Sequence, residues 1–261
     1  WSYLTHVPKL QYKYYRVPAP NFVGNVRCVI LSDLHLGRHA DDEVRLARIV
    51  EDCVQGKPDF ILLPGDFVNM QPLAGGRIVP RRIAELLRPL SESAPTFAVM
   101  GNHDAEYDVE DIQDCLRAIG VTCLNNQSAK LETRGGSLFV CGVEGHSTGA
   151  PDIERALYEV PHDSTVVVMA HDPVTFAQVP SSVSVTISGH THGGQWRLPL
   201  LGPMFNASSA PLKWTLGHIV EDGKNLVVSA GIGTSGLPWR LNCPPEIVWV
   251  TLVGRGPFEG I

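Results

Sequence analysis

The feature that most constrains the fold is a repeated alternation of short apolar runs with amphipathic helical patterns in the first half of the chain. Each apolar run ends in polar residues, as a buried strand does where it leaves a sheet. The runs occupy residues 26–33, 58–66 and 95–104. Helical patterns follow at 41–54, 81–90 and 109–120. Such alternation with short connections predicts a parallel sheet crossed by helices.

The second half changes character, because its apolar runs have fewer helical patterns between them. These runs occupy residues 137–145, 164–172, 182–192, 225–233 and 246–253. Two sheets packed face to face, with helices outside, would account for both halves. The length permits one domain or two. Since there is no linker-like stretch and no internal repeat, we expect a single domain spanning residues 1–261.

Charge and hydropathy exclude some classes of function. The net charge is -6 and no run of Lys and Arg forms a basic stripe, so a stable nucleic-acid partner is not expected. No apolar run approaches the roughly 20 residues that a membrane-spanning helix needs. A bound phosphate would therefore need a source of positive charge other than basic side chains.

Residues able to bind metal stand at the ends of the predicted strands. They are Asp33, His35, Asp66, Asn102, His171, His190 and His192. Alternate residues of a strand share a face, so we expect the pair Asp33 and His35 and the pair His190 and His192 each to point at one place. One His-x-His pair is often an accident of sequence, but ligand types at five strand ends predict a metal site.

These blocks, in this order, resemble the calcineurin-like metallophosphoesterases. The matching motifs are D-x-H at 33–35, G-D at 65–66, G-N-H-D at 101–104, His171 and G-H-x-H at 189–192. The stretch 227–252, with "GHTHGGQ", also resembles a bacterial membrane-associated branch that includes proteins similar to UDP-2,3-diacylglucosamine pyrophosphohydrolases. The resemblance implies an α/β fold, a four-layer α/β/β/α sandwich of two mixed sheets flanked by helices.

The same resemblance implies two divalent metal ions that share Asp66. One ion would be held by Asp33, His35, Asp66 and His192, and the other by Asp66, Asn102, His171 and His190. Only two of these ligands are anionic, so positive charge would remain for a phosphate. We expect manganese first, while an O and N ligand set without cysteine also suits iron, zinc or cobalt.

Beside the ligands, the resemblance assigns catalytic roles to His103 and Asp104. His103 would contact the phosphate and assist departure of the leaving oxygen, with Asp104 as its orienting partner. Arg38 and His39 follow the first ligand pair and are candidate substrate-binding residues, although charged residues in that place are often simply solvated.

Two further stretches leave their roles open. Residues 198–217 are apolar but contain three prolines, which exclude a continuous regular helix. A flap over the site, a surface that meets lipid and a long packed loop all remain possible there. Residues 231–238 are glycine-rich but lack the lysine of a P-loop, so we interpret them as a tight structural loop.

The leading hypothesis is a binuclear metal-dependent phosphodiesterase or pyrophosphohydrolase, in which a metal-bridging hydroxide attacks phosphorus in line. A phosphomonoesterase, nuclease or protein phosphatase of the same superfamily is an alternative. So is a catalytically silent scaffold, which the retention of every ligand disfavours. The expected substrate is a phosphodiester or pyrophosphate, with lipid-linked compounds among the alternatives.

Position 1 is Trp, which favours a preceding segment such as a signal peptide or an anchor. If such a segment was removed, we expect the protein to be exported or to make peripheral membrane contact; otherwise we expect it in the cytoplasm.

Overall fold

The computed structural model describes residues 9–37, 41–70, 78–204 and 206–256. Its first sheet is mixed and six-stranded. Its order is β1 (Gln11–Val23), β14 (Glu246–Arg255), β2 (Asn25–Ile30), β3 (Phe60–Leu63), β4 (Thr96–Ala98) and β5 (Thr122–Cys123). Strands β2, β3 and β4 are parallel neighbours, as predicted, and β5, which the sequence did not predict, pairs parallel with β4. Strand β14 pairs antiparallel with β2 and parallel with β1.

The second sheet is also mixed and six-stranded. Its order is β12 (Gly217–Glu221), β13 (Lys224–Val228), β9 (Val185–Ser188), β8 (Thr165–Ala170), β7 (Gly136–Val143) and β6 (Gln127–Thr133). The four central strands are parallel, and β12 and β6 join their neighbours antiparallel at the two edges. In both sheets, the ligand-type residues follow the carboxyl ends of the parallel strands.

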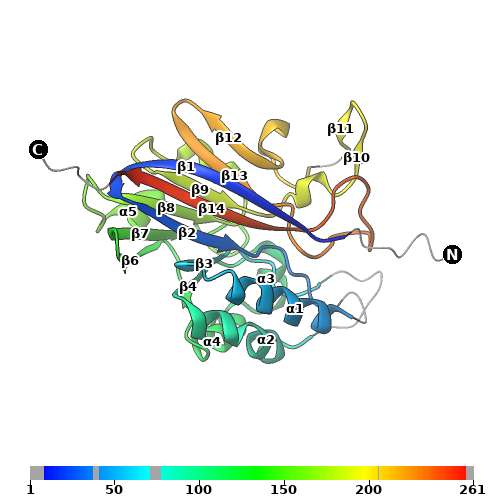
Figure 1. Cartoon of the computed structure of the whole chain (residues 1–261). Helices are drawn as coiled ribbons and strands as arrows, with labels where there is room; N and C mark the ends of the chain where they lie inside the picture. Colours follow the sequence, from blue (N-terminus) through cyan, green and yellow to red (C-terminus); the bar gives the residue numbers. More distant parts are fainter. Residues whose placement is uncertain (1–8, 38–40, 71–77, 205, 257–261) are drawn as a thin grey trace, which may run out of the picture.

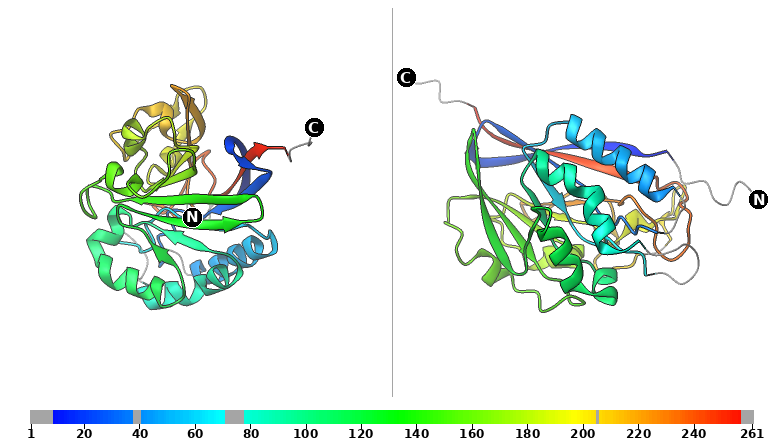
Figure 2. Two further views of the ribbon diagram at one scale, coloured as in Figure 1. Left: turned by 90° about the vertical axis from the view of Figure 1, so that its left-hand side faces the viewer. Right: turned by 90° about the horizontal axis from the view of Figure 1, so that it is seen from below.

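Helices lie outside the two sheets (Figures 1 and 2). The first sheet is covered by α1 (Asp42–Gln55), α2 (Pro80–Ser93) and α4 (Val109–Arg117). The short elements are α3 (Asn102–Tyr107), α5 (Ile153–Leu157), η2 (Pro173–Gln178), η3 (His192–Gly194), η4 (Leu212–Trp214) and a small hairpin of β10 (Arg197–Leu198) and β11 (Gly202–Pro203). In the described part of the chain, no helix is both long and apolar enough to cross a bilayer.

The alternation of side chains along the strands produces the layers. In β2, Val29 packs under the helices, whereas Cys28 and Ile30 face the second sheet. In β8, Val167 faces the first sheet and Val168 packs outward beneath α5. Because each central strand is apolar on both faces, each sheet must be covered twice, which confirms the predicted four-layer sandwich.

Candidate metal centre

The ligand-type residues lie beyond the strands, in sharply turned loops. Strand β2 ends at Ile30 and β9 ends at Ser188. Asp33 and His35 have φ of 53° and 42°, and His190 and His192 have φ of 67° and 50°. Strand alternation therefore does not aim these pairs, and that part of the prediction is wrong. The left-handed backbone of two residues in each loop determines the direction of these side chains instead.

Left-handed backbone is costly for residues with a Cβ, by about 1–3 kcal/mol each, so neighbouring groups must hold it in place. The first loop is held by the loop after β3: Asp33 N donates to Gly65 O at 3.0 Å, and His35 N donates to Asp66 O at 3.1 Å. Asp66 itself has φ of 57°. Concentration of this conformation at ligand-type residues is what a functional site shows.

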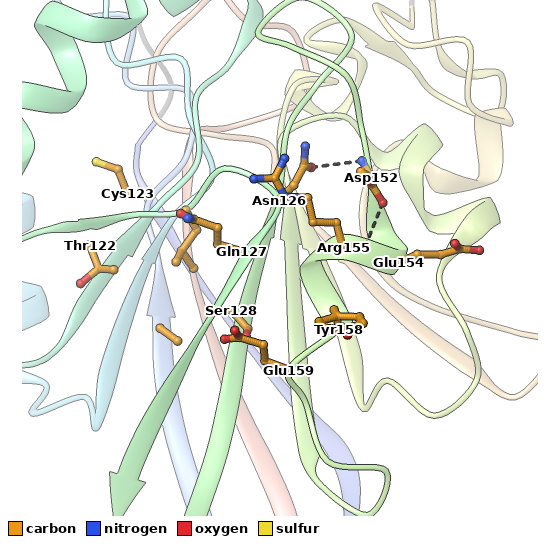
Figure 3. A pocket seen from close by; sticks show the side chains of 12 residues that line it. Thr122, Cys123, Asn126, Gln127, Ser128, Asp152, Glu154, Arg155, Tyr158 and Glu159 are labelled. Atoms are coloured by element: carbon orange, nitrogen blue, oxygen red, sulfur yellow. Dashed lines mark hydrogen bonds between the residues drawn. The ribbon is translucent and has the colours of Figure 1, made fainter.

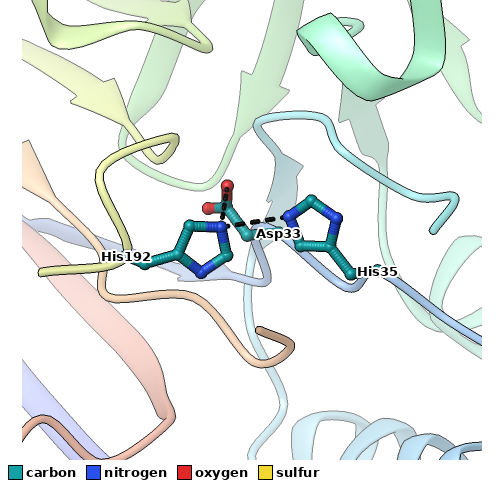
Figure 4. Close-up of side chains that lie close together, drawn as sticks. All are labelled: Asp33, His35 and His192. Carbon is teal, nitrogen blue, oxygen red and sulfur yellow. Dashed lines mark hydrogen bonds and ion pairs between the residues drawn. The ribbon is translucent and has the colours of Figure 1, made fainter. Parts of the chain in front are cut away.

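The first ligand group consists of Asp33, His35 and His192 (Figure 4). The two imidazoles approach with 3.0 Å between their Nε2 atoms, and His192 Nε2 lies 3.6 Å from Asp33 Oδ1. All three residues are at most 4% exposed. Asp66 Oδ2 lies 3.5 Å from His35 Nε2, so it adjoins this group.

The second group forms on the other side of Asp66. His171 Nε2 lies 3.3 Å from Asp66 Oδ2, 3.2 Å from Asn102 Oδ1 and 3.1 Å from His190 Nδ1. The other ring nitrogen of His171 is 2.7 Å from Pro64 O, which sets the ring's orientation. The structure thus brings together the seven residues that the sequence suggested as ligands, with Asp66 between the two groups.

The chemistry of these donor sets fits metal ions. Ring nitrogens and carboxylate oxygens converge, and these atoms offer lone pairs that repel unless a proton or a cation lies between them. In the described part of the chain, neither Asp33 nor Asp66 forms an ion pair with Lys or Arg. Imidazole and carboxylate ligands suit divalent transition metals.

Electrostatics within the centre also call for positive charge. Burial, with the neighbouring Asp66 carboxylate adding to it, raises the pKa of Asp33 to about 6. Burial alone would lower the pKa of His171, but the charge of Asp66 and its bond to the ring raise it to about 10. Burial lowers the pKa of His35 to about 3, which keeps that ring neutral and able to bind a metal.

His103 lies at the edge of the centre, where it is 7% exposed. Its backbone N–H donates to Asp66 Oδ1 at 2.9 Å, and its ring meets the His35 ring edge to face with centroids 5.0 Å apart. Nε2 is 3.5 Å from Ser235 Oγ and Nδ1 is 3.1 Å from Glu106 Oε2. His103 is thus placed to reach a group bound at the centre, and Glu106 orients it.

Asp104 does not have the expected contact with the His103 side chain. Its buried carboxylate accepts backbone N–H groups instead, from Gly101 at 2.9 Å, Asp66 at 2.8 Å, Phe67 at 2.8 Å and Val68 at 3.4 Å. These bonds tie the loop after β3 to the loop after β4. The predicted orienting contact from Asp104 to His103 is therefore replaced by a structural role for Asp104, and the carboxylate beside the His103 ring is that of Glu106.

Two glycines let the loops approach the carboxylates closely. A Cβ at Gly101 would overlap the carboxylate and backbone of Asp66. A Cβ at Gly189 would overlap Ser32 Oγ and Asp33 Oδ2. The G of G-N-H-D and the G of G-H-x-H are therefore steric requirements of the site.

Arg240 and Glu106 were not found from the sequence. Arg240 is 5% exposed and donates to carbonyl groups that include Ala230 O at 2.7 Å and Gly233 O, while its Nη2 lies 3.3 Å from His192 Nδ1. It holds the 231–238 loop against the centre through bonds to carbonyl groups of that loop. A lone Arg in an apolar stretch gives no spacing signal. Arg38 and His39 lie outside the described residues.

Two cavities open at the centre. One, of about 500 Å³, is lined by Trp196 and Leu237 among others, and the second, of about 590 Å³, by Glu106 and Asp172 among others. A larger cavity of about 680 Å³ lies elsewhere, between β6 and α5 (Figure 3), and contains no ligand-type residue of the centre.

Comparisons with known proteins agree with this geometry. The family model described as calcineurin-like phosphoesterase matches residues 26–194. Phosphodiesterase YaeI of Escherichia coli (strain K12) is 30% identical over 236 residues, which cover 87% of this chain and 82% of YaeI. An uncharacterized metallophosphoesterase of Aquifex aeolicus (strain VF5) is 29% identical over 244 residues, which cover 88% of this chain and 86% of that protein.

Among solved structures, a candidate 5′-nucleotidase from Staphylococcus aureus in complex with α-ketoglutarate aligns with a TM-score of 0.51 and 13% identity. The alignment covers 91% of this chain and 56% of that chain, and it supports the fold alone. The family match, the similarity to YaeI and the clustered histidines and aspartates lead to one conclusion. The chain belongs to the calcineurin-like phosphoesterases, a family of metal-dependent hydrolases.

Proposed function

We propose that this protein is a phosphodiesterase or pyrophosphohydrolase that uses two divalent metal ions, with manganese the first candidate. The observation that carries the proposal is the position of Asp66 between two ligand groups, with ring nitrogens 3.3 and 3.5 Å from one of its oxygens. A shared carboxylate of this kind is typical of two-metal phosphoryl-transfer sites.

The ligand set explains how an acidic chain can hold a phosphate. Two divalent ions, when bound, supply Lewis acidity and activate water as a nucleophile. Asp33 and Asp66 bind and balance only part of that charge, because the remaining ligands are neutral. His103, held by Glu106 at 3.1 Å, is placed to donate a proton to the leaving oxygen.

Two other functions are weaker candidates. A silent scaffold has no need to keep seven buried or half-buried ligands, five of which have costly left-handed backbone. A phosphomonoesterase or nuclease would use the same ligands, so the choice depends on the cavities. Two cavities beside the centre favour a substrate with a group on each side of the phosphorus, as in a diester or a pyrophosphate.

The test is hydrolysis by manganese-loaded protein of bis-p-nitrophenyl phosphate and p-nitrophenyl phosphate, with the metal content of each sample measured. We expect about two metal ions per chain and a preference for the diester. Folded protein that takes up no transition metal would refute the metal-dependent function. A preference for the monoester would refute the diesterase proposal while leaving the metal centre intact.

We also propose peripheral membrane contact through the tip of the β10–β11 hairpin, and this rests on its exposed apolar side chains. The side chain of Leu200 is fully exposed, that of Leu201 is 77% exposed, and that of Met204, directly after the hairpin, is 59% exposed. Co-sedimentation with phosphatidylcholine vesicles is expected to fall in the double variant Leu200→Ser, Leu201→Ser. Val220→Ser, at an exposed valine on β12, is the matched control. Equal binding by all three proteins would contradict the proposal.

A further inference from the structure

The two cavities at the centre differ in chemistry but share part of their lining. Asn102 and His190, both ligand candidates, and Ala207 line both of them. The two cavities therefore open from the same place, where a phosphorus group would be bound. A substrate held there would extend one substituent into each cavity.

The first cavity is apolar and firmly built. Trp196 stacks on Trp239 with ring centroids 4.5 Å apart, and its indole N–H donates to Trp239 O at 3.0 Å. Gln195 Nε2 donates to Ser235 O at 2.9 Å and Leu237 O at 3.0 Å. These bonds satisfy the N–H groups of the Gln195 amide and the Trp196 indole. The apolar side chains of Trp196 and Leu237 line the cavity of about 500 Å³.

The second cavity is polar and mostly offers hydrogen-bond acceptors. Its lining includes Glu106 and Asp172, with the hydroxyl groups of Ser147 and Ser209. The side chain of Glu106 is 54% exposed and that of Asp172 27% exposed, so part of each carboxylate is accessible, while Glu106 Oε2 contacts His103 and Asp172 Oδ1 accepts from Val174 N and Ser208 Oγ. Carboxylates accept hydrogen bonds and repel anions, so this lining favours a hydroxyl-rich substituent over a negatively charged one.

We propose that the substrate is an amphiphilic phosphodiester or pyrophosphate, whose apolar substituent lies against Trp196 and Leu237 and whose hydroxylated substituent lies against Glu106 and Asp172. This assignment rests on the proposed hydrolase function and adds the substrate class. The apolar cavity adjoins Trp196, which immediately precedes the β10–β11 hairpin in the chain, so an acyl or alkyl chain could pass between that surface and the centre.

The apolar half is tested by binding, measured by calorimetry on manganese-loaded protein with methyl-, butyl-, hexyl- and octylphosphonate, which contain no ester bond. Each buried methylene should tighten binding by up to about fourfold. Leu237→Ser should flatten this dependence on chain length. Val220→Ser, at an exposed valine on β12 outside both cavities, should keep the wild-type dependence. Affinity independent of chain length in the wild-type protein would overturn the assignment.

The polar half is tested by the ratio of kcat/KM for two esters with the same hexyl group, hexyl phosphoglycerol and hexyl phosphoglycerate. We expect the uncharged glycerol ester to be preferred by about tenfold or more, since the glycerate carboxylate would face Glu106 and Asp172. Equal rates, or a preference for the glycerate, would overturn this half. Methyl p-nitrophenyl phosphate separates the hypotheses, because its hydrolysis supports the diesterase function whatever the other substituents show.

Discussion

Replacement of Asp104 by Asn should destabilise the protein and empty its metal centre, although Asp104 is not itself a metal ligand. Oδ2 accepts from Asp66 N at 2.8 Å and Gly101 N at 2.9 Å, and Oδ1 accepts from Phe67 N at 2.8 Å. An amide can replace one of these oxygens but presents N–H groups in place of the other. Two backbone N–H groups would then face a donor in a site that excludes water.

The size of the effect follows from those contacts. A hydrogen bond to a charged group contributes about 1.5–3 kcal/mol, so loss of the two bonds at one oxygen should cost about 3–6 kcal/mol. In a chain of this length each kcal/mol lowers the unfolding midpoint by roughly 2–4 °C, so a loss of about 3–6 kcal/mol should lower the midpoint by roughly 6–24 °C. Asp66 N loses its acceptor if the amide nitrogen takes the place of Oδ2, and the adjacent Phe67 N loses its acceptor in the other orientation, so the shared ligand should move and metal should be lost.

The assay is thermal unfolding followed by circular dichroism, together with elemental analysis of the purified protein. Asp108→Asn is the matched control, because Asp108 is exposed and caps α4 by accepting from Glu110 N at 3.0 Å, and Asn caps a helix as well as Asp does. The reasoning would be refuted if Asp104→Asn kept its metal and its stability and lost only turnover. That outcome would restore Asp104 as a partner of the catalytic histidine.

Three further predictions concern the centre itself. His103→Ala should keep the metal and most of the stability but lower turnover by about 10²- to 10⁴-fold, with a smaller loss for nitrophenolate than for alkoxide leaving groups. An equal loss for both leaving groups would mean that His103 is not the acid. Loss of metal would mean that the role of His103 is misassigned. Asp66→Ala should remove most metal at both positions, whereas Asp33→Ala should weaken chiefly one; equal stoichiometry in the two variants by elemental analysis would contradict a shared Asp66. Gly101→Ala should lower both the unfolding midpoint and the metal content, since the methyl group overlaps the Asp66 carboxylate; wild-type values for both would show that the loops can separate at little cost.

Much of the layer structure could be predicted because it depends on local apolar patterns. The predicted helix at 41–54 corresponds to α1 at Asp42–Gln55, and that at 81–90 corresponds to the centre of α2 at Pro80–Ser93. Strand β1 was not predicted, because residues 11–23 include two prolines and many exposed side chains. It forms at a sheet edge by pairing with β14, which is distant in sequence and so leaves no local signal.

The ligand residues could be predicted from the order of motifs, but their geometry could not. Strand alternation suggested that His190 and His192 point at one place, whereas they lie in a left-handed loop and join different ligand groups. Asp104 was assigned a side-chain partner because it follows His103, whereas its carboxylate binds backbone groups from another loop. Such contacts depend on the relative position of two loops, which cannot be predicted from residue types alone.

The position of the centre explains how substrate choice can vary without loss of the metal site. Asp33, Asp66 and Asn102 follow strands of the first sheet, whereas His171 and His192 follow strands of the second. Each ligand group therefore takes residues from both sheets, and the packing between the sheets determines their separation. The apolar wall of the first cavity comes instead from Gln195, Trp196 and Leu237, which lie in loops outside the two sheets. Because that wall contributes little to the core between the sheets, its sequence can change with the substrate while the metal ligands stay in place.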